Sequence, residues 1–299
     1  MRVLVSGTNG LIGSSVVAHL TEQGHQVSPL VRGAQTGRSD DVRWNPLTGV
    51  IDREGLEGLD AVVHLAGENI AARRWSARQK SRIRDSRVVG TRFLVEALAQ
   101  SQQRPKLILS ASAIGFYGNR GDEELTEASD PGTGFLAEVC QEWEAVANVA
   151  REQNIRVVNL RFGVVLSTEG GALAKMLLPF RLGLGGVVGS GQQYWSWIAL
   201  EDVPLVIEHV LSCDELEGPV NCVAPVAATN RQFTKTLGKV LHRPTVFPMP
   251  GFAARLLLGE MAEDLVLASA RVLPARLRET GYDFRHAQLD DALRSILSR

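Results

Sequence analysis

Three glycines spaced three residues apart near the amino terminus constrain the fold more than any other feature of this sequence. The apolar residues 2–6 lead into a turn that holds Gly7, Gly10 and Gly13, and a helical pattern begins at residue 11. In a strand–turn–helix unit the first glycine permits the tight turn, the second lets a ligand approach the backbone, and the third lets the helix pack against the strand. The turn is therefore predicted to bind the pyrophosphate of a dinucleotide at the helix amino terminus. The candidate contacts are Gly7, Thr8, Asn9, Gly10, Leu11, Ile12 and Gly13.

The end of the second predicted strand indicates which dinucleotide is bound. NAD sites usually place Asp or Glu here to bind the adenosine ribose, whereas this strand ends in Val31 and Arg32. A guanidinium can form a forked contact with the 2′-phosphate of NADP(H), which a carboxylate would repel. We therefore expect NADP(H) as the cofactor, with Val31 and Arg32 among its contacts. A solvated surface arginine is the alternative.

Apolar segments alternate with amphipathic helical segments through the first half of the chain. Strands are predicted at residues 2–6, 26–31, 60–66, 106–111 and 155–162, and helices at residues 11–23, about 76–100 and about 135–153. This alternation is typical of an α/β protein with a doubly wound parallel Rossmann sheet. After Phe162, glycine-rich segments interrupt the alternation. We expect residues 1–163 to form an NADP-binding Rossmann domain, intertwined with a smaller α+β substrate region at residues 164–299.

Charge and cysteine content narrow the class of protein further. The formal net charge is -1 and the charges are scattered, so we expect neither a nucleic-acid nor a membrane partner. Cys140, Cys213 and Cys222 are odd in number and lack C-x-x-C spacing, which predicts neither a disulfide framework nor a bound metal. The chain enters its first strand directly, without a signal-peptide pattern, and has no long apolar run. We expect a cytoplasmic protein.

Several further segments resemble one known family when taken together. They are His64-Leu65-Ala66-Gly67, Arg74-Trp75, Ser86 to Thr91, Ser110-Ala111-Ser112, Phe116-Tyr117-Gly118, Gly134 to Ala137, Cys140 to Glu144, Gly163 to Ser167 and Ser196-Trp197-Ile198. With the glycine spacing, they resemble the extended short-chain dehydrogenases of the NAD-dependent epimerase/dehydratase superfamily. The likeness is strongest to an atypical, SulA-like branch that carries a carboxy-terminal DUF1731 domain, here residues 248–297. It covers nearly the whole chain and implies a Rossmann domain whose carboxy-terminal region folds over the nicotinamide end.

The resemblance also shows where the usual catalytic pattern is missing. Typical members polarise the substrate with Ser or Thr and use a Tyr-x-x-x-Lys pair for proton transfer. Ser112 keeps the first position, but Leu136 and Cys140 stand at the places of the tyrosine and lysine, and Arg87 replaces the usual Asn. Tyr117, on the loop after the strand at 106–111, is a candidate replacement proton donor, and a packed aromatic is the alternative. Ser112 and Tyr117 are thus the candidate catalytic residues.

The other candidate cofactor contacts follow the predicted strands or lie on the helix at residues 76–100. Arg87, with Arg82 nearby, offers a cation to the cofactor or to an anionic substrate, because a fixed cation in a cleft needs an anion to offset its desolvation. A salt bridge between helices is the alternative. Glu68 contacts ribose or substrate, or else caps the next segment. His64, in an apolar strand, is expected to be a hydrogen-bonded core residue. The additional contacts are Leu65, Ala66, Gly67, Glu68, Arg82, Arg87, Ser110 and Arg161.

Two functional hypotheses follow. The first is an NADP(H)-dependent oxidoreductase or epimerase that acts on a small or nucleotide-linked substrate, with Trp195 and Trp197 either lining its pocket or anchoring the smaller region. The second is a binding module without turnover, in which cofactor occupancy reports redox state to a partner protein. The missing Tyr-x-x-x-Lys pair favours the second, and related sequences are associated by name with cell-division control. Extended relatives often form homodimers through helices that correspond to residues 76–100 and 135–153.

Overall fold

The computed structural model describes residues 1–33 and 41–298. A seven-stranded, all-parallel sheet with the order β11-β7-β5-β4-β1-β2-β3 forms its centre. Its strands are β1 (Arg2–Ser6), β2 (Gln26–Arg32), β3 (Val42–Trp44), β4 (Ala61–His64), β5 (Leu107–Ala113), β7 (Arg156–Phe162) and β11 (Gly218–Cys222). The expected doubly wound α/β fold is confirmed.

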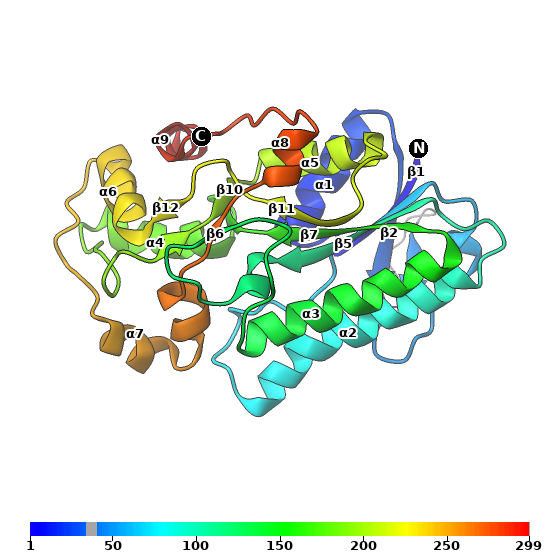
Figure 1. Ribbon diagram of the computed structural model, residues 1–299, viewed down its shortest axis with the longest axis horizontal. Helices are drawn as coiled ribbons and strands as arrows, with labels where there is room; N and C mark the ends of the chain where they lie inside the picture. The colour runs from blue at the N-terminus through cyan, green and yellow to red at the C-terminus, as the bar shows by residue number, and fades with distance from the viewer. Residues whose placement is uncertain (34–40, 299) are drawn as a thin grey trace.

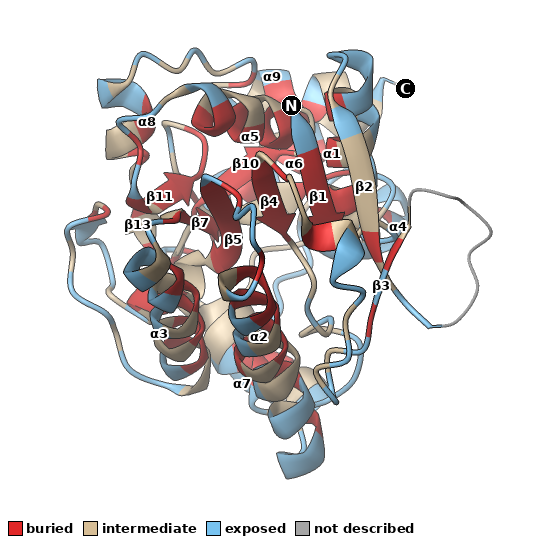
Figure 2. Ribbon diagram, turned by 90° about the vertical axis from the view of Figure 1, so that its right-hand side faces the viewer, coloured by how far each residue is buried: buried red, intermediate tan, exposed pale blue. Residues whose placement is uncertain are grey.

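Helices cover both faces of this sheet (Figure 1). On one face α2 (Ala77–Ala99) and α3 (Phe135–Asn148) run side by side, and on the other lie α1 (Leu11–Glu22) and α5 (Asp202–Ser212). Two apolar cores result, because successive residues of a strand point to opposite faces. Val3 and Val5 of β1 belong to the core beneath α1 and α5, whereas Leu4 belongs to the core beneath α2. Figure 2 shows β4 and most of β1 and β5 buried, whereas β2 is largely intermediate or exposed.

The carboxy-terminal region lies beside one end of the sheet and has its own core around Phe180, Trp197 and Phe233. Its helices are α4 (Gly171–Arg181), α6 (Asn230–Leu241), α7 (Gly251–Leu258), α8 (Ala275–Glu279) and α9 (Leu289–Leu297), with a π-helical turn η4 at Glu263–Leu267. Three two-stranded sheets join β10 (Trp197–Ala199) to β8 (Val164–Leu166), β12 (Ala228–Thr229) to β9 (Tyr194–Trp195), and β13 (Arg271–Val272) to β6 (Glu124–Leu125). The short 3-10 helices are η1 (Glu54–Leu56), η2 (Ile114–Tyr117) and η3 (Val149–Gln153).

The element boundaries differ from the predicted ones in ways that matter for the site. The strand predicted at residues 106–111 extends to Ala113 and so includes Ser112. The helix predicted at residues 135–153 ends at Asn148 and continues as a 3-10 helix. Neither β3 nor β11 was among the predicted strands, and β11 brings a segment from beyond residue 163 into the central sheet. In the described ranges, none of the helices combines the length and apolar character needed to cross a membrane.

Candidate functional site

The turn between β1 and α1 has the geometry that its three glycines predict. Gly7 has a φ of 73°, and a Cβ there would lie 2.8 Å from the carbonyl oxygen of Leu65. A Cβ at Gly13 would lie 2.1 Å from the carbonyl oxygen of Gly7, so this close approach of helix and turn excludes any side chain. At Gly10 a Cβ would meet only the Gly7 oxygen, at 3.2 Å. Gly7 and Gly13 are therefore required by packing, whereas Gly10 leaves room on the exposed side of the turn.

The amino terminus of α1 is free to bind an anion. Its N-cap residue is Gly10, no side chain caps it, and its first turn contains no acidic residue. The first backbone N–H groups of a helix have no partner within the helix and carry a partial positive charge. Asn9 and Gly10 are exposed. The turn can thus direct backbone donors at a phosphate group.

A cavity of about 950 Å³ opens beside the carboxyl ends of β2 and β3. Its walls combine apolar surface from Trp44 and Leu47 with four arginines. Arg32 comes from the end of β2, as predicted, and is exposed. The full set of arginines is Arg32, Arg43, Arg78 and Arg82. The carboxylates of Asp52, Glu68 and Asp85 also line it, and the combination of apolar surface with an excess of guanidinium groups suits a flat base linked to a phosphate.

The loop after β4 lies against the glycine turn. The backbone N–H groups of Leu65 and Ala66 both donate to the Ser6 hydroxyl, at 3.0 and 3.1 Å. Ser6 also bonds Nδ1 of His64 at 2.7 Å, and Thr91 bonds its Nε2 at 3.1 Å. Burial lowers the pKa of His64 to about 4. His64 is therefore a neutral, hydrogen-bonded core residue, which agrees with the expectation for it.

Glu68 is held by neighbouring side chains at the edge of the same cavity. Its carboxylate forms an ion pair with Arg82 at 3.1 Å, and its backbone N–H donates to the Ser86 hydroxyl at 2.9 Å. The residue lines the cavity and also ties the loop to α2, and its contact with ribose or substrate stays a prediction.

Arg87 is the unusual cation of α2. Lys80, Arg82 and Arg84 each form an ion pair with a carboxylate. Arg87 takes part in none of the ion pairs found among the described residues. Its guanidinium donates from Nη1 to the carbonyl oxygens of Glu68 and Ile83, both at 3.0 Å. It also lies over the Trp143 ring at 5.1 Å, and a Cβ on Gly67 would lie 3.2 Å from its Cζ. Burial lowers the pKa of this guanidinium, so the site disfavours the charge unless an anion or a polar ligand binds it.

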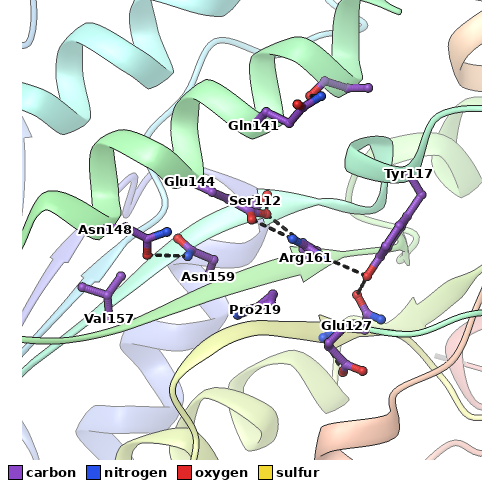
Figure 3. A network of polar contacts seen from close by, with 12 residues as sticks. Ser112, Tyr117, Glu127, Gln141, Glu144, Asn148, Val157, Asn159, Arg161 and Pro219 are labelled. Carbon is purple, nitrogen blue, oxygen red and sulfur yellow. Dashed lines mark hydrogen bonds and ion pairs between the residues drawn. The ribbon is translucent and has the colours of Figure 1, made fainter. Parts of the chain in front are cut away.

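A buried polar network occupies the carboxyl ends of β5 and β7 (Figure 3). Arg161 and Glu144 form a two-pronged ion pair, with Nε–Oε1 and Nη2–Oε2 distances of 2.8 Å. Ser112 donates to the same carboxylate at 2.6 Å. Burial alone opposes the charge on Arg161, but the hydrogen bonds and attraction of Glu144 outweigh it and raise the pKa of the arginine. Ser112 and Arg161 are thus bonded to protein groups rather than directed into an open site.

Tyr117 belongs to this network as a packed residue. It is 0% exposed, and its hydroxyl donates toward Oδ1 of Asn221 at 2.7 Å and lies 3.0 Å from the Thr126 carbonyl oxygen. The hydroxyl also accepts from Nη1 of Arg161 at 2.9 Å, and burial raises the pKa of the phenol. This geometry fits the packed-aromatic alternative rather than proton donation to a ligand. Ser110, 1% exposed on β5, is likewise inside the sheet.

Leu136 and Cys140, on the first turns of α3, face the loop after β5. A Cβ on Gly115 would lie 3.3 Å from Cβ of Leu136 and 3.9 Å from Sγ of Cys140. Burial raises the pKa of the Cys140 thiol to about 11, so the group is neutral at physiological pH. Asp264, on η4, lies near the Leu136 backbone N–H, which favours the charged form of its carboxylate while burial raises its pKa. The carboxy-terminal region thus reaches the amino terminus of α3.

Sequence reasoning missed Glu144 and Asn221 as partners within this network. One signal was available, because an arginine inside the apolar strand that ends at Phe162 needs a buried anion. Trp195 and Trp197 also act as anchors of the smaller region: Trp197 is 1% exposed, and the Trp195 indole donates to the Val266 carbonyl oxygen at 3.3 Å. The structure brings together the glycine turn, the loop at residues 65–68, Arg32 and Arg82, and places Ser110, Ser112, Tyr117 and Arg161 in the sheet interior.

The fold and the turn together define a Rossmann-type α/β protein. Residues 3–221 match the NAD dependent epimerase/dehydratase family, and residues 249–296 match DUF1731, a domain of unknown function. The chain belongs to the NAD dependent epimerase/dehydratase family. The resemblance drawn from the sequence, including its carboxy-terminal domain, is confirmed.

Three similar proteins support this assignment, two of which match over nearly their whole length. "Epimerase family protein Mb2239" of Mycobacterium bovis is 41% identical over 97% of this chain and 96% of its own length. The crystal structure of human epimerase family protein SDR39U1 (isoform2) with NADPH has a TM-score of 0.90 and 34% identity, and covers 100% of both chains. A nucleoside-diphosphate sugar epimerase from Corynebacterium glutamicum has a TM-score of 0.82 and 36% identity, over 99% of this chain and 58% of that one.

Proposed function

We propose that this protein binds NADP(H) at the carboxyl edge of its sheet and is an oxidoreductase or epimerase of its family. The observation that carries the proposal is the uncapped amino terminus of α1, which follows a turn where Gly7 and Gly13 leave no room for a side chain. The human relative crystallised with NADPH supports the same cofactor. The uncapped helix terminus and the arginines of the cavity offer the hydrogen-bond donors that such a ligand needs.

The proposed contacts run along the edge of the sheet. Backbone N–H groups of residues 7–13 hold the pyrophosphate, and Arg32 binds the 2′-phosphate beside the arginine-lined cavity. The loop at residues 65–68 lies next to the turn, and Arg87 offers the free donors of its guanidinium toward the nicotinamide half. The bound cofactor supplies a hydride to an electrophilic carbon of a small-molecule substrate.

The side chains near β5 limit how fast such a reaction runs. The Ser112 hydroxyl donates its hydrogen bond to Glu144, and the Tyr117 hydroxyl is bonded to other groups of the protein. General acid catalysis typically contributes about 10² to 10⁴ in rate, so an enzyme without a side-chain donor is slow and takes its proton from water. This same observation favours a second candidate, a binding module in which NADP(H) occupancy controls a partner protein.

The test of cofactor choice is a titration of purified protein with NADPH and NADH. We expect tighter binding of NADPH, by about tenfold for each 1.4 kcal/mol of differential binding, and reversal of the order in Arg32→Asp. Arg104→Asp, which changes an exposed arginine away from the cavity, should leave both affinities unchanged. Equal dissociation constants for the two cofactors in the unaltered protein would contradict the proposal.

A screen with carbonyl compounds separates the two candidates. Slow oxidation of bound NADPH by any of them supports the enzyme. NADPH binding with no oxidation across the screen supports the binding module.

A further inference from the structure

Exposed apolar side chains gather at one end of the carboxy-terminal region. Of the fourteen large apolar residues that are exposed in the described part of the chain, nine fall in residues 178–184 and 246–257. Several project far into solvent, with Phe252 71% and Leu256 79% exposed. We name these nine residues the apolar tip: Leu178, Leu182, Leu184, Val246, Phe247, Met249, Phe252, Leu256 and Leu257.

The loops that carry the two segments of the apolar tip are joined by backbone hydrogen bonds. Phe247 donates its backbone N–H to the Gly185 carbonyl oxygen at 3.4 Å, and Met249 donates to Val187 at 2.9 Å. A Cβ on Gly186 would collide with the Phe247 carbonyl oxygen. A glycine is therefore required here for residues 185–187 to pair with residues 247–249. Helix α7 follows directly and lies at the same end of the molecule as α4 (Figure 1). An apolar surface of this kind usually marks an interaction site.

Basic residues predominate in the two stretches of sequence that carry the apolar tip, although Glu263 and Asp290, from outside these stretches, pair with two of them. No Asp or Glu occurs between Glu169 and Glu201, or between Glu217 and Glu260. These two stretches carry the basic residues Lys175, Arg181, Arg231, Lys235, Lys239, Arg243 and Arg255. The whole-chain charge of -1 conceals this local excess.

Five of these cations are not offset by a carboxylate. Lys239 pairs with Asp290 and Arg255 with Glu263, but none of the ion pairs among described residues includes the other arginines of this set, Lys175 or Lys235. Lys175 donates to the Ala71 carbonyl oxygen at 2.9 Å, Arg243 to the Arg181 carbonyl oxygen at 2.8 Å, and Lys235 to the Thr245 hydroxyl at 3.0 Å. Apart from Lys175, these exposed and unpaired residues are named the basic rim: Arg181, Arg231, Lys235 and Arg243.

The positive charge of the basic rim indicates which kind of partner binds the apolar tip. A second copy of the chain, docked through the same surface about a two-fold axis, would bring the four cations of each copy together, and like charges in contact are unfavourable. Protruding Phe and Leu side chains surrounded by Lys and Arg are instead typical of proteins that insert into the headgroup layer of anionic membranes. We propose that the apolar tip and basic rim dock this protein reversibly on an anionic lipid bilayer. This reverses, for one surface, the expectation of no membrane partner that the net charge suggested.

The test is sedimentation of the purified full-length protein with lipid vesicles. We expect binding to phosphatidylcholine vesicles that contain phosphatidylglycerol, weaker binding to phosphatidylcholine alone, and loss of binding as salt is raised. Arg181→Glu and Arg243→Glu should each weaken binding about fivefold or more. Leu256→Asp should abolish it, because it places a charge where a side chain enters the apolar layer.

Matched variants keep the proposal falsifiable. Arg104→Glu and Val149→Asp make the same changes on exposed positions of the Rossmann part and should bind vesicles like the parent. Thermal unfolding verifies that each variant is folded, independently of any cofactor. Equal sedimentation with both vesicle types, or none with either, overturns the proposal. So does a dimer in lipid-free buffer that Leu256→Asp converts to a monomer, because self-association would then explain the surface.

Discussion

The two halves of the sheet's carboxyl edge differ in how they use their polar groups. At β1, β2 and β4, the turn keeps backbone N–H groups unpaired, and arginines line an open cavity. At β5 and β7, the polar side chains bond one another in the interior, as Ser112, Glu144 and Arg161 do. Polar groups that are already paired stabilise the fold but offer little to a ligand. The first half therefore leaves polar groups available to the proposed ligand, and the second half uses its polar groups within the fold.

The largest expected effect is on the open half, where Gly10→Val should abolish NADPH binding. A Cβ at Gly10 meets only the Gly7 carbonyl oxygen at 3.2 Å, and its φ of -86° suits any residue, so the chain folds while the side chain blocks the approach of a phosphate. Titration calorimetry measures the loss. Gly13→Val is the contrast, because its Cβ would lie 2.1 Å from backbone oxygen and should lower the melting temperature as well. Unchanged NADPH affinity in Gly10→Val would mean that the open half is misassigned.

The closed half should respond in stability rather than in binding. Glu144→Ala leaves the buried cation of Arg161 without its partner, which costs about 3–5 kcal/mol of unfolding free energy in comparable cases. Urea unfolding measures this loss. Glu142→Ala, which breaks the exposed pair with Arg84, should change stability by no more than about 0.5 kcal/mol. The comparison between the two halves fails if the two variants are equally stable, or if Glu144→Ala loses NADPH affinity while keeping its stability.

A smaller effect is expected at His64, which lies between the two halves on β4. Its pKa is about 4 in the folded chain and 6.5 when exposed, so the unfolded state takes up a proton first as the pH falls. Its contribution is complete above pH 6.5 and is lost as the pH falls from there toward 4, by roughly 3 kcal/mol in total. Urea unfolding from about pH 7 to about pH 5 should show this decline, and His64→Gln should flatten it. An equally steep decline in the variant would assign the effect to other groups.

The elements that sequence could predict are those with local signals. Spacing and periodicity along neighbouring residues predict the glycine turn and the four central strands β1, β4, β5 and β7. They also place Arg32 at the end of β2. Strand β11 was missed because Pro219 and Asn221 interrupt its pattern. A proline is tolerated there since β11 is an edge strand, and the amide of Asn221 is buried because Tyr117 bonds it.

The chemistry of the closed half could not be predicted for a related reason. Ser112 was assigned from the family resemblance and Tyr117 from its place after β5, but their partners Glu144 and Asn221 lie 32 and 104 residues away in the chain. No short-range pattern encodes such pairings. The apolar tip could not be predicted either. Composition is an average over the whole chain, and the two segments of the tip come together only in the folded protein.

The long stretch of chain between β7 and β11 also affects how the protein folds during synthesis. Its register runs from Gly218 beside Val158 to Cys222 beside Phe162, so β7 stays an open edge on the nascent chain until the intervening helices and loops have left the ribosome. Exposed edges of this kind invite pairing with other chains. Premature termination anywhere between residues 163 and 217 would leave that edge permanently bare, and the fragment would be a target for chaperones and proteases rather than a small working domain.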